Sequence, residues 1–138
     1  MSALKISIFV SAVLAASAVH AGSIDTFRQF CVANAGDPQA IANAGKKAGF
    51  KMTSAVGGMM GFRKKTDESL QVNVATKHKF ECAVTTSDMA NPGQVSADFF
   101  KSLGLKPKGA TAKGSIGGKT YTFLHDTRGG EAFVMFAD

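Results

Sequence analysis

His125 is the residue whose side chain is most readily connected with catalysis in this sequence. An imidazole changes protonation near neutral pH and can therefore serve as a general base. Asp126 follows directly on a predicted strand, so the two side chains point to opposite faces and cannot form a dyad. A working His125 would need a carboxylate from elsewhere, and Asp88 and Glu131 are the two that we consider. Because no catalytic constellation is visible, we keep His125 only as a catalytic candidate and expect a binding protein rather than an enzyme.

The two cysteines, Cys31 and Cys82, are predicted to form a disulfide. Cys31 shares a helical face with Phe27, and Cys82 alternates along a strand with Phe80 and Val84, so both thiols are expected to point into the core. A bridge across this separation would stabilise the fold by about 4 kcal/mol on the chain-entropy model. There is no C-x-x-C motif and neither cysteine has a histidine beside it, which argues against a redox or nucleophilic role.

Basic residues cluster in the middle of the chain, and two methionines precede them. If they share one rim they would form a surface for an anionic partner, and the flexible methionines would add an adaptable apolar contact. The candidate binding residues are Arg63, Lys64, Lys65, Lys77, His78, Lys79, Met59 and Met60. The alternative is an ordinary solvated surface. Interleaved aromatic residues that would stack on bases are missing, so we predict no nucleic-acid partner.

No cofactor or metal site is predicted. The segment from Gly114 to Thr120 looks like a phosphate-binding loop, but position 113 is lysine where that loop needs its first glycine. The residues that follow read as a strand, whereas a phosphate-binding loop must open a helix. Adjacent methionines without a Met-x-Met spacing do not make a soft-metal site.

Residues 1–21 have the three parts of a secretory signal peptide. Lys5 supplies the positive charge, Ile6 to Ala16 is apolar, and Val19 and Ala21 are small residues at the positions that signal peptidase reads. The apolar stretch is too short for a membrane-spanning helix, and no later segment is long enough. We therefore expect a periplasmic or secreted protein whose residues 22–138 form a single domain. The style of the signal suits a bacterium, and a eukaryotic secretory route stays open.

The composition is that of a folded basic domain. The chain of 138 residues is 45% hydrophobic and contains eleven phenylalanines, one tyrosine and no tryptophan. Removal of residues 1–21 takes away Lys5 and leaves 15 basic and 10 acidic residues, a net charge of +5. In the cell envelope this charge favours anionic neighbours.

The elements that would position these residues follow from caps, glycines and periodicity. Helices are predicted at 24–35, with Ser23 as N-cap, and after the Asp-Pro and Asn-Pro pairs at 37–38 and 91–92. Glycine-rich segments 50–61 and 108–119 read as loops, the first with an irregular strand edge as its alternative, and strands are predicted near 70–74, 80–84, 120–125 and 131–137. This order, α-α-β(β)β-α-β-β, predicts an α+β fold with three helices, an antiparallel or mixed sheet of four to five strands and one disulfide.

These observations predict a small exported binding or accessory protein with a basic surface, in which an inhibitor-like role is included. Its expected partner is an envelope protein or an anionic glycan or lipid surface. Two alternatives remain. One is a small exported hydrolase that uses His125 or a carboxylate, and the other is a binder of an apolar ligand in a cavity between helices and sheet, lined by methionines and by Phe99, Phe123 and Phe133. The sequence does not give the oligomeric state or the identity of the partner.

Overall fold

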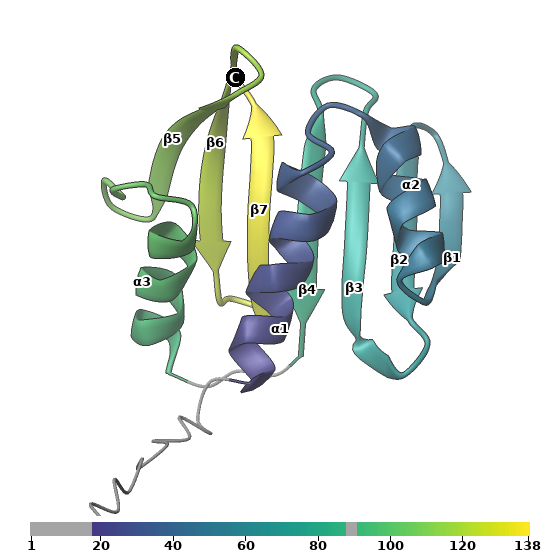
Figure 1. Ribbon diagram of the computed structural model, residues 1–138, viewed down its shortest axis with the longest axis horizontal. Coiled ribbons are helices and arrows are strands. Elements are labelled where there is room, and N and C mark those ends of the chain that lie inside the picture. Colours follow the sequence, from purple (N-terminus) through teal and green to yellow (C-terminus); the bar gives the residue numbers. More distant parts are fainter. Residues whose placement is uncertain (1–17, 88–90) are drawn as a thin grey trace, which may run out of the picture.

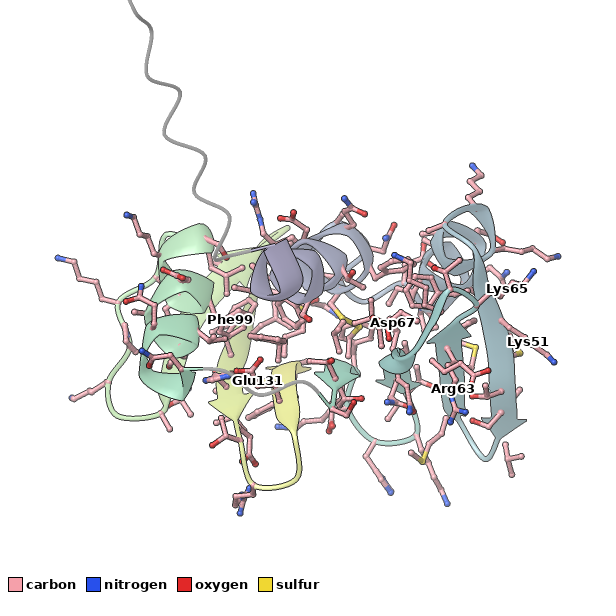
Figure 2. All side chains as sticks on the ribbon, turned by 90° about the horizontal axis from the view of Figure 1, so that it is seen from below. Lys51, Arg63, Lys65, Asp67, Phe99 and Glu131 are labelled. Atoms are coloured by element: carbon pink, nitrogen blue, oxygen red, sulfur yellow. A yellow bond between two sulfur atoms is a disulfide. The ribbon has the colours of Figure 1, made fainter. Side chains whose placement is uncertain are left out.

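A single antiparallel sheet with helices on one of its faces forms the protein. The computed structural model describes residues 18–87 and 91–138. The apolar core of the predicted signal peptide and Asp88 therefore lie outside the described residues. Figure 1 shows the helices in front of the sheet, and the view from below in Figure 2 shows them together on one side of it.

The sheet has seven strands in the order β1-β2-β3-β4-β7-β6-β5, and every neighbouring pair is antiparallel. The helical segments are α1 (Ala18–Phe27), the π-helical turn η1 (Arg28–Val32), α2 (Pro38–Lys47) and α3 (Pro92–Ser102). The strands are β1 (Phe50–Val56), β2 (Met59–Lys64), β3 (Asp67–Ala75), β4 (Glu81–Thr86), β5 (Thr111–Ile116), β6 (Lys119–Asp126) and β7 (Glu131–Ala137). Helix α1 crosses the middle of the sheet, and α2 and α3 cover its two ends (Figure 1).

The predicted α+β fold with four to five strands is wrong, because the sheet has seven strands and dominates the structure. The additional strands come from the two segments that read as glycine-rich loops, 50–61 and 108–119. Each contains a Gly-Gly pair, at 57–58 and at 117–118, in which both glycines have positive φ. Such a pair makes a two-residue hairpin turn whose twist matches the flanking strands. Strand β1 lies at the edge of the sheet and is exposed after Phe50, so it lacks the alternation that marks a half-buried strand.

Helices α2 and α3 begin where the sequence predicts. The Asp37 carboxylate accepts a hydrogen bond from the Ala40 amide at 3.0 Å, and the Asn91 side-chain oxygen accepts one from Gln94 at 3.2 Å. Each bond satisfies one of the amides that a helix leaves free at its start. Proline follows each cap at the first helical position, where its missing amide costs nothing.

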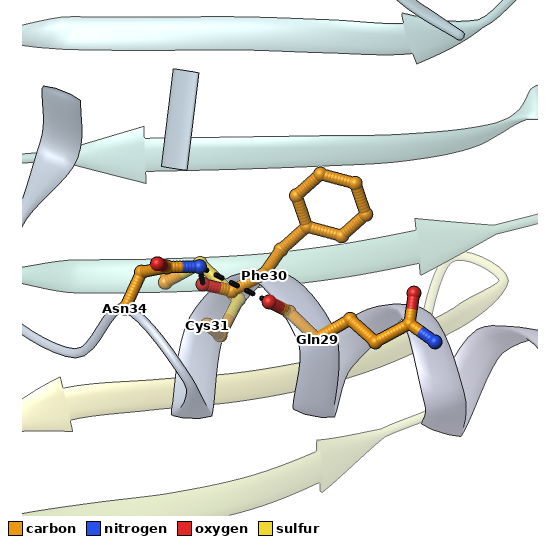
Figure 3. Close-up of a disulfide and its surroundings, with 5 residues drawn as sticks. Gln29, Phe30, Cys31 and Asn34 are labelled. Atoms are coloured by element: carbon orange, nitrogen blue, oxygen red, sulfur yellow. Dashed lines mark hydrogen bonds between the residues drawn. A yellow bond between two sulfur atoms is a disulfide. The ribbon is translucent and has the colours of Figure 1, made fainter. Parts of the chain in front are cut away.

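The first helix differs from its prediction over 24–35. Helix α1 begins at Ala18, so Ser23 is a buried residue inside the helix and not its N-cap. The predicted cleavage point after Ala21 also falls within α1. The chain then continues into the π-helical turn η1, which Asn34 closes by donating hydrogen bonds to the carbonyls of Gln29 and Phe30 at 3.0 and 3.1 Å (Figure 3).

The predicted disulfide is confirmed. Cys31 in η1 and Cys82 in β4 are bonded, with their Cα atoms 5.5 Å apart and both side chains buried (Figure 3). The bridge therefore fastens the first helical segment to β4, the central strand of the sheet.

The core fills the space between the helices and the sheet face that they cover. Along the central strands alternate residues point inward, as with Val72 and Val74 of β3, which are nearly inaccessible to solvent. Phe123 pairs across the ladder with Met135, and Phe27 of α1 packs edge-on against Phe99 of α3 with ring centroids 5.1 Å apart. Among the described residues, no helix is long and apolar enough to cross a membrane.

Candidate functional site

The residues that the sequence groups into one basic surface lie at two ends of the sheet. Strand β2 runs from Met59 to Lys64, and at about 3.3 Å per residue its ends are roughly 17 Å apart. The Met59 end lies beside the β3–β4 turn, since a Cβ atom on Gly58 would lie 3.2 Å from the Cβ atom of Lys77. Arg63 and the turn that follows it are at the opposite end. The structure therefore does not bring all the predicted binding residues together.

The end that contains the β1–β2 and β3–β4 turns is apolar at its tip and basic beside it. Val56 and Met59 are 77% and 58% exposed, and the turn residues Lys77, His78 and Lys79 are also exposed. Adjacent Met60 pairs with Val74 and packs against the core, so the two methionines face opposite sides of the sheet. A flexible apolar tip of this kind can make an adaptable contact with a partner.

The other end of β1 and β2 forms a groove, which we call the α2–β1 groove. It consists of two adjoining hollows of about 370 and 430 Å³ that share Lys51, Met52 and Lys65. The apolar lining residues are Ala42, Phe50, Met52 and Phe62, and the cationic ones are Lys46, Lys51, Arg63, Lys64 and Lys65. Figure 2 shows Lys51, Arg63 and Lys65 near one another at the β1 edge of the molecule. Glu68 is the one acidic residue among those that line the two hollows.

The local sequence explains why the groove has this shape. Helix α2 lies close to the sheet at Gly45, where a Cβ atom would be in van der Waals contact with the ring of Phe62 at 3.5 Å. Gly49 then reverses the chain with φ +80, so that Phe50 can enter β1 and pack its ring 4.9 Å from that of Phe30. The Lys65 amide donates to the Gly49 carbonyl at 3.1 Å. This bond ties the α2–β1 connection to the β2–β3 turn and holds the two hollows side by side.

Cationic residues outnumber acidic ones in the lining of the groove, five to one. Asp67, which pairs with Lys64 across the β2–β3 ladder, lies beside the groove as a second acid. Lysine and arginine near an apolar floor keep their stems on the apolar surface and their charged ends in water. The groove can therefore present several positive charges to a ligand that lies on its floor.

His125 and Glu131 form a second, buried constellation. The structure places His125 beside Glu131, one of the two carboxylates considered for it, with Nε2 and Oε1 3.6 Å apart. Their side chains are 4% and 0% exposed, and the imidazole stacks on Phe133 with ring centroids 5.1 Å apart. Burial lowers the pKa of His125, against the opposing effects of Glu131 and Asp126. A substrate in solution cannot reach this imidazole while the fold stays closed, so the pair has the character of a buried core contact.

Asp126 points away from His125, as the alternation predicts. It accepts hydrogen bonds from the backbone and the guanidinium of Arg128 in the β6–β7 turn, which lower the pKa of its carboxyl to about 2. The segment that looks like a phosphate-binding loop is the β5–β6 hairpin and opens no helix. Among the described residues, no three histidine, cysteine, aspartate or glutamate side chains are grouped as a metal site would require.

Lys46, Lys51 and Met52 are groove residues that sequence reasoning did not select. Their signal was weak, because Lys46 looks like an ordinary basic residue in the last turn of a helix and Lys51 and Met52 fall in a segment that read as a loop. The pairing of β1 with β2 brings Lys51 and Met52 beside Arg63, and the packing of α2 on this end of the sheet adds Lys46. The sequence matches no protein-family model, and no curated protein or solved structure is significantly similar to it.

Proposed function

We propose that this chain is an exported, non-enzymatic binding protein that holds an anionic ligand or partner in the α2–β1 groove. The observation that carries the proposal is the gathering of five cationic residues along two adjoining hollows whose lining contains one acid, Glu68. Three of the five, Arg63, Lys64 and Lys65, belong to the basic cluster that the sequence points to.

The chemistry of the groove supports recognition of phosphate or carboxylate groups. Arginine offers a planar fork of donors that matches such an anion, and lysines add flexible point charges. Charges of one sign that line a concave surface raise the local concentration of the opposite charge and speed its association. Since these side chains lie at the surface, the attraction should weaken as salt shortens the Debye length, about 8 Å at physiological ionic strength.

Burial of His125 and Glu131 supports binding over catalysis. A general base must come within hydrogen-bond reach of the proton that it abstracts. Side chains that are 4% and 0% exposed do not offer that reach to an outside substrate. An inhibitor-like role, in which the groove holds an acidic segment of another protein, belongs to the same proposal.

Charge reversal in and outside the groove tests the proposal. Lys51→Glu/Lys65→Glu changes two groove residues, and Lys106→Glu/Lys119→Glu makes the same change in net charge at exposed positions toward the β5 edge. Binding of the exported protein to defined anionic probes would be titrated at low and high salt: an acidic peptide, a phosphorylated glycan and an anionic detergent. We expect the groove variant to lose at least about tenfold in affinity for one probe while the control keeps most of it. Equal losses in both variants would show that only net charge matters and would overturn the proposed site.

A further inference from the structure

The two hollows of the α2–β1 groove differ in chemistry although they share a wall. One is floored by apolar side chains and the other is ringed by cations, and Lys51, Met52 and Lys65 belong to both. Resting on the function proposed above, we infer that the ligand is a monomeric anionic amphiphile. One acyl chain would lie in the first hollow, and a phosphate or carboxylate head group would lie in the second.

The first hollow has the properties of an acyl-chain site. Its floor is fixed, because Phe50 and Phe62 are only 6% and 3% exposed and belong to the core. Met52 is 47% exposed and stands between the two hollows, where its unbranched, polarisable side chain can adapt to a flexible chain. A volume of about 370 Å³ lies within the usual range of small-ligand pockets. Each methylene group that moves from water onto this floor makes binding more favourable.

The second hollow has the properties of a head-group site. Arg63 sits on β2 directly opposite Lys51 of β1, and Lys64 and Lys65 continue from it into the β2–β3 turn. The bond from the Lys65 amide to the Gly49 carbonyl keeps this turn against the end of the apolar hollow. Lys51 and Arg63 alternate with Met52 and Phe62, so their side chains leave the opposite face of the sheet. An amphiphile would therefore pass over the exposed edge of β1, where Lys51, Met52 and Lys65 line both hollows.

An acidic peptide added as an extra strand along β1 is the competing occupant. Strand addition needs a regular row of free backbone groups on the edge strand. The register of β1 shifts between Met52 and Ser54, and such an irregularity interrupts edge pairing. Lys51 also projects from this edge strand, and charged side chains on edges discourage pairing. These features favour a ligand that lies across the groove over one that extends the sheet.

The test compares ligands that carry one or both parts of the amphiphile, each titrated below its micellar concentration by calorimetry. Dodecyl phosphate carries both parts, dodecyl maltoside only the chain, and inorganic phosphate only the anion. We expect dodecyl phosphate to bind at least about tenfold more tightly than either, and octyl phosphate to bind more weakly than dodecyl phosphate. Vesicles of anionic phospholipid form a separate arm, because affinity for them above that for dodecyl phosphate would assign the site to a membrane surface and overturn the monomeric ligand.

Two matched methionine variants test where the alkyl chain of the ligand binds. Met52→Gln removes an apolar wall of the groove, whereas Met59→Gln makes the same change at a comparably exposed methionine near the tip of the same hairpin. We expect Met52→Gln to lower the affinity for dodecyl phosphate by about three- to tenfold and to leave the affinity for inorganic phosphate unchanged. Met59→Gln should change neither affinity. Equal effects of the two variants would overturn the inference.

The outcomes separate this inference from the function on which it rests. If an acidic peptide or inorganic phosphate binds in a way that Lys51→Glu/Lys65→Glu abolishes, while the alkyl chain adds nothing, the amphiphile is excluded and the anion site stands. If no anionic probe depends on the groove lysines, both proposals fail.

Discussion

The imidazole of His125 and the carboxylate of Glu131 face each other across the β6–β7 hairpin, with Nε2 and Oε1 3.6 Å apart and almost no exposure to solvent. The turn between them lies against β4 so closely that only glycine fits at position 130. A Cβ atom there would lie 2.7 Å from the Thr86 carbonyl oxygen. Burial holds the pKa of His125 below its usual value, so the folded protein contains mainly the neutral imidazole at neutral pH. The pair therefore links the protonation of the core to the stability of the fold.

The free energy of unfolding should fall as the pH drops from 7.5 to 5. In the unfolded chain His125 takes up a proton near pH 6.5, whereas in the fold its pKa is lower, so the unfolded state binds more protons in this window. One such group contributes a slope of at most about 1.4 kcal/mol per pH unit. Asp126, with a pKa of about 2, stays ionised throughout and does not add to the slope. Urea titrations at several pH values measure the free energy of unfolding and hence this slope.

His125→Gln should flatten this pH dependence, because the amide side chain keeps a polar group at this position and does not titrate. His78→Gln is the matched control, since His78 is an exposed histidine in the β3–β4 turn. An unaltered slope in His125→Gln would show that the acid sensitivity arises elsewhere.

Loss of the disulfide should destabilise the protein by about 2–5 kcal/mol. The bridge closes a sequence separation of 51 residues and joins η1 to β4, so its removal frees the unfolded chain and loosens the first helical segment. The thermal midpoint with and without reductant measures the effect, together with the variant Cys31→Ala/Cys82→Ala. Reductant should have no effect on that variant, because the chain contains no other cysteine. A variant as stable as the oxidised parent would contradict this role.

The sequence indicated most strongly those elements whose signals are local. Asp37-Pro38 and Asn91-Pro92 mark the starts of α2 and α3 because a cap and a proline act within one helical turn. The inward pairing of Phe123 with Met135 follows from the alternation of two half-buried strands. The bridge between Cys31 and Cys82 follows from two apolar faces that each carry one thiol.

The edge strands and the groove could not be predicted from such local signals. Strand β1 is stabilised by its ladder with β2 and not by a buried face of its own, so its residues carry no period. The Gly-Gly turns at 57–58 and 117–118 were a usable hairpin signal, yet glycine-rich segments read equally well as loops. Because the groove depends on the pairing of β1 with β2, and β1 read as part of a loop, its position was not predictable.

Alanine at Gly58 should destabilise the protein more than alanine at Gly118. Both glycines have φ +79 at the second position of a Gly-Gly turn, so each substitution strains the backbone by roughly 1–2 kcal/mol. At Gly58 the new Cβ atom would also lie 3.2 Å from the Cβ atom and 3.3 Å from the amide nitrogen of Lys77, whereas at Gly118 nothing lies within 4 Å. Chemical denaturation measures the difference. Equal losses would show that the two neighbouring turns do not pack as closely as described.

Gly45→Ala should stabilise the protein, although it adds an atom to a buried position. Gly45 lies inside α2, where glycine is less favourable than alanine by about 0.5–1 kcal/mol. The added Cβ atom would lie 3.5 Å from the Phe62 ring and 3.7 Å from Phe30 and Phe50, which is ordinary van der Waals contact. A raised thermal midpoint with unchanged affinity of the groove is the expected result, because the new methyl group faces the core side of Phe62. Gly45→Leu serves as the overpacked comparison and should destabilise, since a larger side chain would force these rings apart. A lower midpoint for Gly45→Ala would mean that α2 cannot approach the sheet as closely as the groove requires.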